Sequence, residues 1–215
     1  MKTKLFKTGL IFFMSITLAG CTFIFQKGRR SDAQKIEELS HQLDQLSQAK
    51  MLLENSLSKE IKDKEVRLEM MEKGLVVTVV GDVLFDSGKA NIREQSFAIL
   101  DKVATVLKDN VPKLSVGIEG HTDNVPIKVS GWKSNWELSS ARALSVLHYL
   151  VDQRKIFPKR LSAIGFGQYA PVASNGNAQG RQLNRRVEIV ILPQLAKESG
   201  KTNRVGLAEP EENLK

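Results

Sequence analysis

Hydrophobic and polar residues are distributed in three different ways along this chain of 215 residues. A short apolar run covers residues 10–18, leucines at a 3-4 spacing cover 36–57, and β-branched runs alternate with helical stripes over 75–192. Apolar residues at every third or fourth position favour an amphipathic helix, whereas β-branched runs favour buried strands. The pattern therefore predicts an N-terminal apolar segment, a long helix and an α/β domain.

The long helix is predicted over residues 31–72, a segment that contains neither Gly nor Pro. Its apolar positions include Ile36, Leu39, Leu43, Leu46, Leu53 and Leu57. Because these positions keep one frame, with only Lys50 out of pattern, we expect a coiled coil with a second copy or another partner helix. A single solvated helix held by charge pairs is the alternative. Ser31 is expected to cap the helix, which would be roughly 60 Å long at 1.5 Å per residue.

The domain is predicted to begin with a strand at residues 75–80 and to end with another at 187–192. Between them we expect helices at 93–108 and 137–153, strands at 114–119 and 161–166, and a short helical turn after the loop at 174–180. The order β-α-β-α-β-(α)-β implies a two-layer α/β (α+β) fold over residues 73–195, with helices packed on a mixed sheet. The strand at 114–119 alternates apolar and polar positions, so we expect it to bury one face. Residues 196–215 lack apolar periodicity and are predicted to be a disordered tail.

The N-terminal residues have the layout of an export signal. Three lysines precede the apolar run, and the string Leu-Ala-Gly-Cys ends it at Cys21. This resembles a bacterial lipobox, in which a signal peptide (residues 1–20) is removed and Cys21 is acylated, leaving 21–30 as a linker. An uncleaved membrane anchor that extends to Phe25 is the alternative. The apolar run is shorter than the about 20 residues that a spanning helix needs, which favours the lipobox.

Composition and charge exclude several classes of function. The net charge is +8, but six basic residues and no acidic residue lie within residues 1–30. The predicted domain has no run of Lys or Arg, so we expect no nucleic-acid partner. Cys21 is the only cysteine, which excludes an internal disulfide. Neither a pair of histidines at ligand spacing nor a nucleophile–base pair is evident, so we predict no metal, cofactor or catalytic residue and interpret His121 as structural.

Two charged residues are candidates for ligand binding. Asp123 follows the strand at 114–119, and Arg142 is predicted on the next helix, on the face that also carries Asn135 and Ser139. A carboxylate and a guanidinium at neighbouring element ends suit a zwitterionic ligand, because one binds an ammonium group and the other a carboxylate. The alternative is that Asp123 and Arg142 simply pair with each other.

Four strings in the domain resemble one known family. They are Gly-His-Thr-Asp-Asn-Val-Pro-Ile at 120–127, Asn-Trp-Glu-Leu-Ser-Ser-Ala-Arg-Ala at 135–143, Gly-Phe-Gly at 165–167, and Gly-Arg-Gln-Leu-Asn-Arg-Arg-Val-Glu at 180–188. Their order and spacing resemble the OmpA-like C-terminal domain, which is shared by peptidoglycan-associated lipoproteins and flagellar motor proteins. The resemblance covers about residues 73–195.

The resemblance implies that the domain binds the diaminopimelate side chain of peptidoglycan without forming a covalent bond. Asp123 occupies the position of the family's ammonium-binding aspartate, and Arg142 that of its carboxylate-binding arginine. Further pocket residues implied by the family motifs are Thr122, Phe85, Asp86, Asn135, Leu138 and Arg185. Arg181 and Arg186 are expected to be structural, pairing with Glu188 or capping a turn.

The expected protein is a non-catalytic tether, anchored by lipid in the outer membrane and facing the periplasm, that binds the cell wall. Thr22 after the cysteine fits outer-membrane sorting. One alternative is a stator subunit of the motor-protein branch, which the Trp136 motif resembles. Such a subunit needs a membrane helix with a proton-carrying acid, and the apolar run contains no Asp or Glu. A cell-wall hydrolase is the other alternative.

Overall fold

The computed structural model describes residues 32–128 and 131–193. Its strands are β1 (Val66–Met71), β2 (Gly74–Val80), β3 (Ser115–His121), β4 (Leu161–Gly167) and β5 (Arg186–Leu192). Its helices are an N-terminal helix over 32–56, α2 (Ser58–Lys62), α3 (Gly81–Leu84), α4 (Phe97–Asp109), α5 (Asn135–His148) and α6 (Ala178–Asn184). The predicted signal peptide, Cys21, the linker 21–30, Ser31 and the tail 196–215 lie outside the described residues.

The strands form one mixed sheet in the order β1-β2-β5-β3-β4. Neighbouring strands are antiparallel except β3 and β4, which are parallel and joined through α5. A parallel pair needs a crossover connection, and the helix predicted between these strands provides it. The predicted mixed sheet and the predicted order of elements after residue 74 are therefore confirmed.

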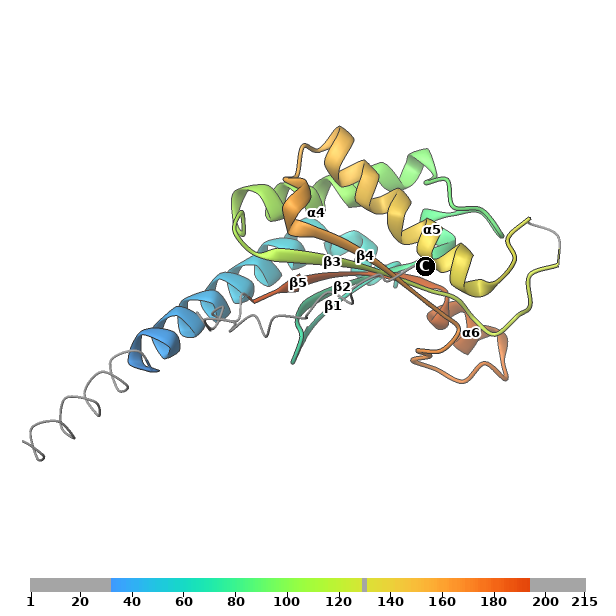
Figure 1. Cartoon of the computed structure of the whole chain (residues 1–215), viewed down its shortest axis with the longest axis horizontal. Helices are drawn as coiled ribbons and strands as arrows, with labels where there is room; N and C mark the ends of the chain where they lie inside the picture. Colours follow the sequence, from blue (N-terminus) through green and yellow to red (C-terminus); the bar gives the residue numbers. More distant parts are fainter. Residues whose placement is uncertain (1–31, 129–130, 194–215) are drawn as a thin grey trace, which may run out of the picture.

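The hydrophobic core lies between the sheet and the helices that cover one of its faces (Figure 1). Alternate residues of the central strands enter it, such as Val77 of β2, Ile118 of β3 and Ile189 of β5, all fully buried. The stripe of α4 that contains Leu100, together with the inner face of α5, packs against them. The architecture has two layers, as expected.

The N-terminal helix differs from the prediction at its C-terminal end. Leu46, Leu53 and Leu57 are fully buried in the same core as the sheet, so they contact their own domain and are unavailable to a second copy. The predicted helix over 31–72 is wrong for its last residues, because α2 ends at Lys62 and β1 follows. Lys64 makes the reversal at φ 59°, a left-handed conformation that usually requires glycine. No glycine therefore marks the end of this helix in the sequence.

The other face of the sheet holds a buried cluster of charges. Lys73 Nζ lies 2.7 Å from Glu119 and 2.9 Å from Glu188, and Arg186 Nε donates to Glu188 at 2.7 Å. The expected pairing of Arg186 with Glu188 is confirmed. The expectation that β3 buries only one face is wrong, because Glu119 and His121 on its polar face are also buried.

Two close approaches fix α5 on the sheet. A Cβ atom at Gly120 of β3 would collide with the carbonyl oxygen of Ser139, and one at Gly165 of β4 would collide with Ser140. Ser139 Oγ also accepts a hydrogen bond from the Gly167 backbone N–H at 2.9 Å. The glycines let the helix backbone contact the strands, which sets the position of the α5 side chains at the sheet end. Within the described residues we find no helix with the length and apolarity needed to cross a membrane.

Candidate functional site

A cavity of about 1020 Å³ lies where β3 ends and α5 begins. The structure brings together in its wall all eight residues that the sequence predicted for a pocket: Phe85, Asp86, Thr122, Asp123, Asn135, Leu138, Arg142 and Arg185. They come from the segment after α3, the end of β3, the first turns of α5 and the start of β5. Residues that are far apart in sequence thus form one site.

Arg142 is a buried cation without an anionic partner in the described part of the chain. Arg142 is only 5% exposed. Its Nε donates to the backbone carbonyl of Lys89 at 2.9 Å, and its Nη2 donates to that of Asp86 at 3.3 Å. The guanidinium carbon also lies 5.1 Å from the centre of the Phe85 ring. Burial lowers the pKa of Arg142 from its ordinary value. The charges of Asp82 and Asp123 oppose this lowering without forming an ion pair with Arg142. A buried charge that hydrogen-bonds only to neutral acceptors favours an added anion.

Asp123 is paired, but its partner is Arg185. Arg185 Nη1 donates to Asp123 Oδ2 at 2.8 Å, and the same guanidinium makes two bonds to Asp82, from Nε at 3.0 Å and Nη2 at 2.7 Å. The hydrogen bonds that Arg185 donates to Asp82, and then the one to Asp123, raise the pKa of Arg185. The remaining Asp123 oxygen, Oδ1, accepts the backbone N–H of Val125 at 3.1 Å. The alternative prediction, that Asp123 pairs with Arg142, is therefore wrong: the partner of Asp123 is Arg185.

The other predicted residues support these two. Thr122 is buried and its backbone N–H donates to the Gly167 carbonyl at 2.9 Å, which holds the end of β3 beside β4. Asn135 Nδ2 donates to the Asp123 carbonyl at 3.3 Å and to Gln168 Oε1 at 2.9 Å. Leu138 provides an apolar part of the wall. The wall is therefore fixed by hydrogen bonds to both strands.

Sequence reasoning missed several residues of this site. Asp82 orients Arg185 through an ion pair. On the rim, Arg93 Nε lies 3.6 Å from Asp86 Oδ1, and Lys89 Nζ lies 3.2 Å from Asp86 Oδ2. Trp132 Nε1 donates to the Gly88 carbonyl at 2.8 Å and so links the loop before α5 to the rim. The one available signal was the position of Asp82 in the chain, four residues before the predicted pocket residue Asp86.

His121 precedes the site residues but faces the charge cluster on the other side of the sheet. Its ring stacks on Phe166 with centres 5.0 Å apart, and Nε2 lies 4.0 Å from Glu119 and 3.9 Å from Glu188. These three side chains could in principle hold a metal ion. Lys73 and Arg186 already neutralise both carboxylates, so the geometry fits a structural cluster better than a metal centre.

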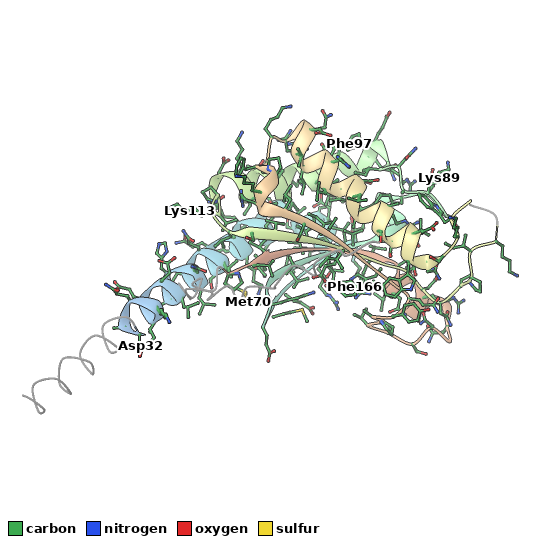
Figure 2. All side chains as sticks on the ribbon, viewed as in Figure 1. Asp32, Met70, Lys89, Phe97, Lys113 and Phe166 are labelled. Carbon is green, nitrogen blue, oxygen red and sulfur yellow. The ribbon has the colours of Figure 1, made fainter. Side chains whose placement is uncertain are left out.

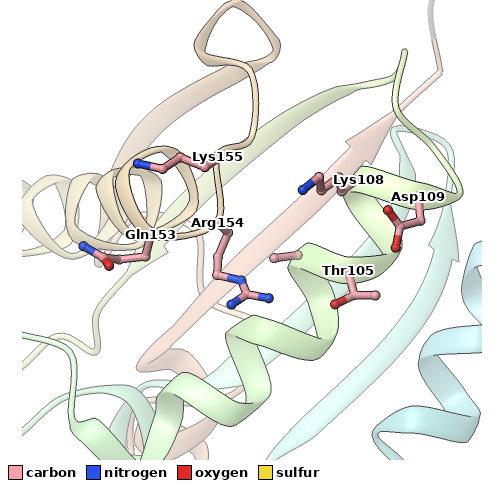
Figure 3. A pocket seen from close by; sticks show the side chains of 7 residues that line it. Thr105, Lys108, Asp109, Gln153, Arg154 and Lys155 are labelled. Carbon is pink, nitrogen blue, oxygen red and sulfur yellow. The ribbon is translucent and has the colours of Figure 1, made fainter.

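A smaller cavity of about 300 Å³ lies between the end of α4 and the turn after α5 (Figure 3). Thr105, Lys108 and Asp109 line it from α4, opposite Arg154 and its neighbours. Arg154 already pairs with Asp101 at 3.3 Å. None of the predicted site residues lines this cavity.

Known proteins share this domain. The model of the OmpA family matches residues 84–185. Motility protein B of Bacillus subtilis is 42% identical over 151 residues, which cover 68% of this chain and 58% of that protein. The probable lipoprotein YiaD of Escherichia coli is 35% identical over 143 residues, which cover 62% of this chain and 63% of that protein. The chain thus spans less than two thirds of the length of either relative.

A solved structure gives the same result. The cell wall anchor of the T6SS from Pseudomonas aeruginosa is 37% identical, with a TM-score of 0.60, and the match covers 66% of this chain and 97% of that one. The five-stranded mixed sheet and the predicted motifs agree with this similarity. The chain therefore carries an OmpA-like C-terminal domain.

Proposed function

We propose that this protein is a non-catalytic, lipid-anchored tether that binds the diaminopimelate side chain of peptidoglycan. The observation that carries the proposal is the pair of opposite charges in one cavity. Arg142 offers a buried guanidinium without a carboxylate partner among the described residues, and Asp123 offers a carboxylate in the same wall. A zwitterion places its carboxylate on the first and its ammonium group on the second.

The position of the helix supports a tether. The end of the N-terminal helix at Asp32 and the rim residue Lys89 lie at opposite ends of the molecule (Figure 2). A membrane anchor upstream of residue 32 would thus be held away from the wall-binding cavity. Because the second half of the helix is docked on the domain, its exposed first part over residues 32–41 extends about 15 Å at 1.5 Å per residue.

Cosedimentation with purified peptidoglycan tests the binding. We expect the full chain to pellet with the polymer and the Asp123→Ala and Arg142→Ala variants to stay in the supernatant. Asp109→Ala and Arg154→Ala are matched controls, because they remove the same residue types beside the smaller cavity. Pelleting of all variants to the same extent would contradict the site. Soluble fragments released from the polymer would instead support the hydrolase alternative.

A stator-like role is the second candidate, favoured by the 42% identity to Motility protein B. The lipoprotein proposal is supported by the lipobox at Cys21 and by a relative named as a probable lipoprotein. Labelling cells with a fatty-acid probe distinguishes the two. We expect wild type to be labelled and to fractionate with the outer membrane, and Cys21→Ala to lose the label. An unlabelled, uncleaved wild-type chain that purifies with a channel partner would favour the stator.

A further inference from the structure

An exposed pair of stacked aromatic rings lies next to the cavity. The rings of Trp136 and Tyr169 are 5.0 Å apart between centres, with planes 22° apart, although the residues are 48% and 64% exposed. Large aromatic side chains bury much apolar area when a ligand covers them. An exposed cluster of such side chains therefore marks a candidate binding surface. This pair has no role in the core.

The backbone holds the pair in place. Gly167, at φ 55°, lies under the indole, and a Cβ atom at this position would be 3.5 Å from the Trp136 ring. Trp136 lies in the first turn of α5, and the turn that carries Tyr169 directly follows β4. Both rings are therefore attached to regular elements, which reduces the entropy lost when a ligand binds.

The pair is continuous with the cavity wall. Asn135, which lines the cavity, donates from Nδ2 to Gln168 Oε1 at 2.9 Å and to the Asp123 carbonyl at 3.3 Å. One amide thus connects the backbone of Asp123 to the side chain of Gln168, the residue before Tyr169, and Asn135 is adjacent to Trp136 in the chain. Neither ring lines the cavity itself, so a molecule bound there reaches the rings only if it extends past Asn135.

We infer that Trp136 and Tyr169 form a sugar-binding subsite for the glycan strand of the polymer whose peptide occupies the cavity. The inference rests on the proposed function. A stem peptide is attached to a sugar ring, whose C–H bonds carry partial positive charge that complements the negative face of an aromatic ring. The polar neighbours Gln168 and Asn135 offer hydrogen-bonding groups to the sugar hydroxyls. The subsite and the cavity together bind one repeating unit of the wall.

Calorimetry on the full chain with two synthetic ligands tests the subsite. One is a stem tetrapeptide that contains diaminopimelate, and the other is the same peptide attached to its disaccharide of N-acetylglucosamine and N-acetylmuramic acid. We expect wild type to bind the disaccharide peptide about tenfold more tightly than the bare peptide, since a stacking contact on the exposed side of the pair supplies that much. The double variant Trp136→Ala/Tyr169→Ala should lose this gain and still bind the bare peptide.

Three further variants make the result specific. Tyr169→Phe keeps the ring and should keep the gain, whereas Phe157→Ala removes a 59% exposed ring elsewhere and should change nothing. Asp123→Ala should lose both ligands. Equal binding of the two ligands by wild type, or a gain that survives in the double variant, overturns the subsite and leaves the proposed function standing. If wild type binds neither ligand, the proposed function fails and the subsite fails with it.

Discussion

Arg185 Nη1 lies 2.8 Å from Asp123 Oδ2, so the carboxylate assigned to the ligand's ammonium group already has a cationic partner in the free protein. A bound ammonium group must therefore share Asp123 with Arg185 or take its place. The two bonds from Arg185 to Asp82 offer the guanidinium a second partner when that happens. The pair keeps the charge of the buried Asp123 satisfied before a ligand arrives.

This relationship predicts a graded series of binding losses. Asp123→Ala should abolish binding of a diaminopimelate peptide, because it removes the only buried carboxylate of the cavity wall among the described residues. Arg185→Gln should weaken binding by about tenfold, since a neutral donor orients Asp123 less firmly than a charged one. Asp82→Asn should cost about twofold or less, because its 47% exposed side chain acts only through Arg185. Titration calorimetry measures the series, and a loss for Asp82→Asn equal to that for Asp123→Ala would contradict it.

Arg142 predicts a conflict between stability and binding. Its guanidinium is buried without a carboxylate partner in the described part of the chain, a costly arrangement in the free protein. We expect Arg142→Met, which keeps the volume and removes the charge, to leave the thermal midpoint unchanged or raised. The same variant should lose binding by about a hundredfold or more, as expected for a charged pair at a buried site. Thermal unfolding and calorimetry on the same sample check this, and a clear fall in the midpoint would argue against it.

The sequence predicted the domain well because its signals are local. The strands β2 and β5 are β-branched runs, and six of the eight predicted pocket residues lie in the four strings that carry the family resemblance. β1 was missed although Val66, Leu68 and Met70 alternate with Arg67 and Glu69, a period of two within a charged segment. The density of charged residues and the absence of Gly and Pro favoured a continued helix. The chain instead reverses at Lys64, which adopts the left-handed conformation in which glycine is expected.

Other features could not be predicted from local patterns. A leucine seam indicates that one face of a helix is buried, but not what buries it. The sequence therefore did not predict that Leu46 and Leu53 pack on their own domain while Leu43 stays exposed. The pairing of Asp123 with Arg185 depends on how β3 and β5 lie side by side, which brings together residues far apart in sequence. Charge and spacing alone equally allowed a pair with Arg142.

Gly120 predicts a severe effect on the fold. Because a Cβ atom there would collide with the Ser139 carbonyl, Gly120→Ala should push α5 away from β3 and reduce the free energy of unfolding by about 3 kcal/mol. Peptide binding should fall as well, since Arg142 moves with the helix. Gly117→Ala on the same strand is the matched control, because its nearest neighbour would be 3.8 Å away. Chemical denaturation measures both variants, and equal stability of the two would contradict the close approach.

His121 predicts a dependence of stability on pH. Burial, followed by the charge of Arg186, lowers the pKa of His121 from 6.5 to about 4. Between these values the unfolded chain binds a proton that the folded chain does not, so stability is lost as the pH falls from 6.5 toward 4. The loss amounts to up to about 3 kcal/mol. His121→Phe, which keeps the ring stacked on Phe166, should remove this slope.

A second group limits the range in which this is measured. Burial alone would raise the pKa of Glu188, but hydrogen bonds from Lys73 and Arg186 hold it below its ordinary value of 4.5. Its contribution to stability is therefore present above pH 4.5 and lost as the pH falls further. Denaturation curves between pH 5 and 7 isolate His121, and an identical slope in His121→Phe and wild type would refute its role.

The N-terminal part of the first helix carries the last prediction, on association. Ile36, Leu39 and Leu43 are 68%, 37% and 54% exposed, whereas Leu46 and Leu53 of the same seam are fully buried in their own domain. We therefore expect a coiled coil between two copies to be confined to the part of the helix that carries these three exposed residues, and to be weak because it is short. The variant Leu39→Glu/Leu43→Glu should shift the mass measured by light scattering toward the monomer without changing peptide binding. Leu52→Glu places one such charge at a 40% exposed leucine outside the seam and should leave the mass unchanged. A wild-type chain that is monomeric at all concentrations would show that the seam has another partner or none.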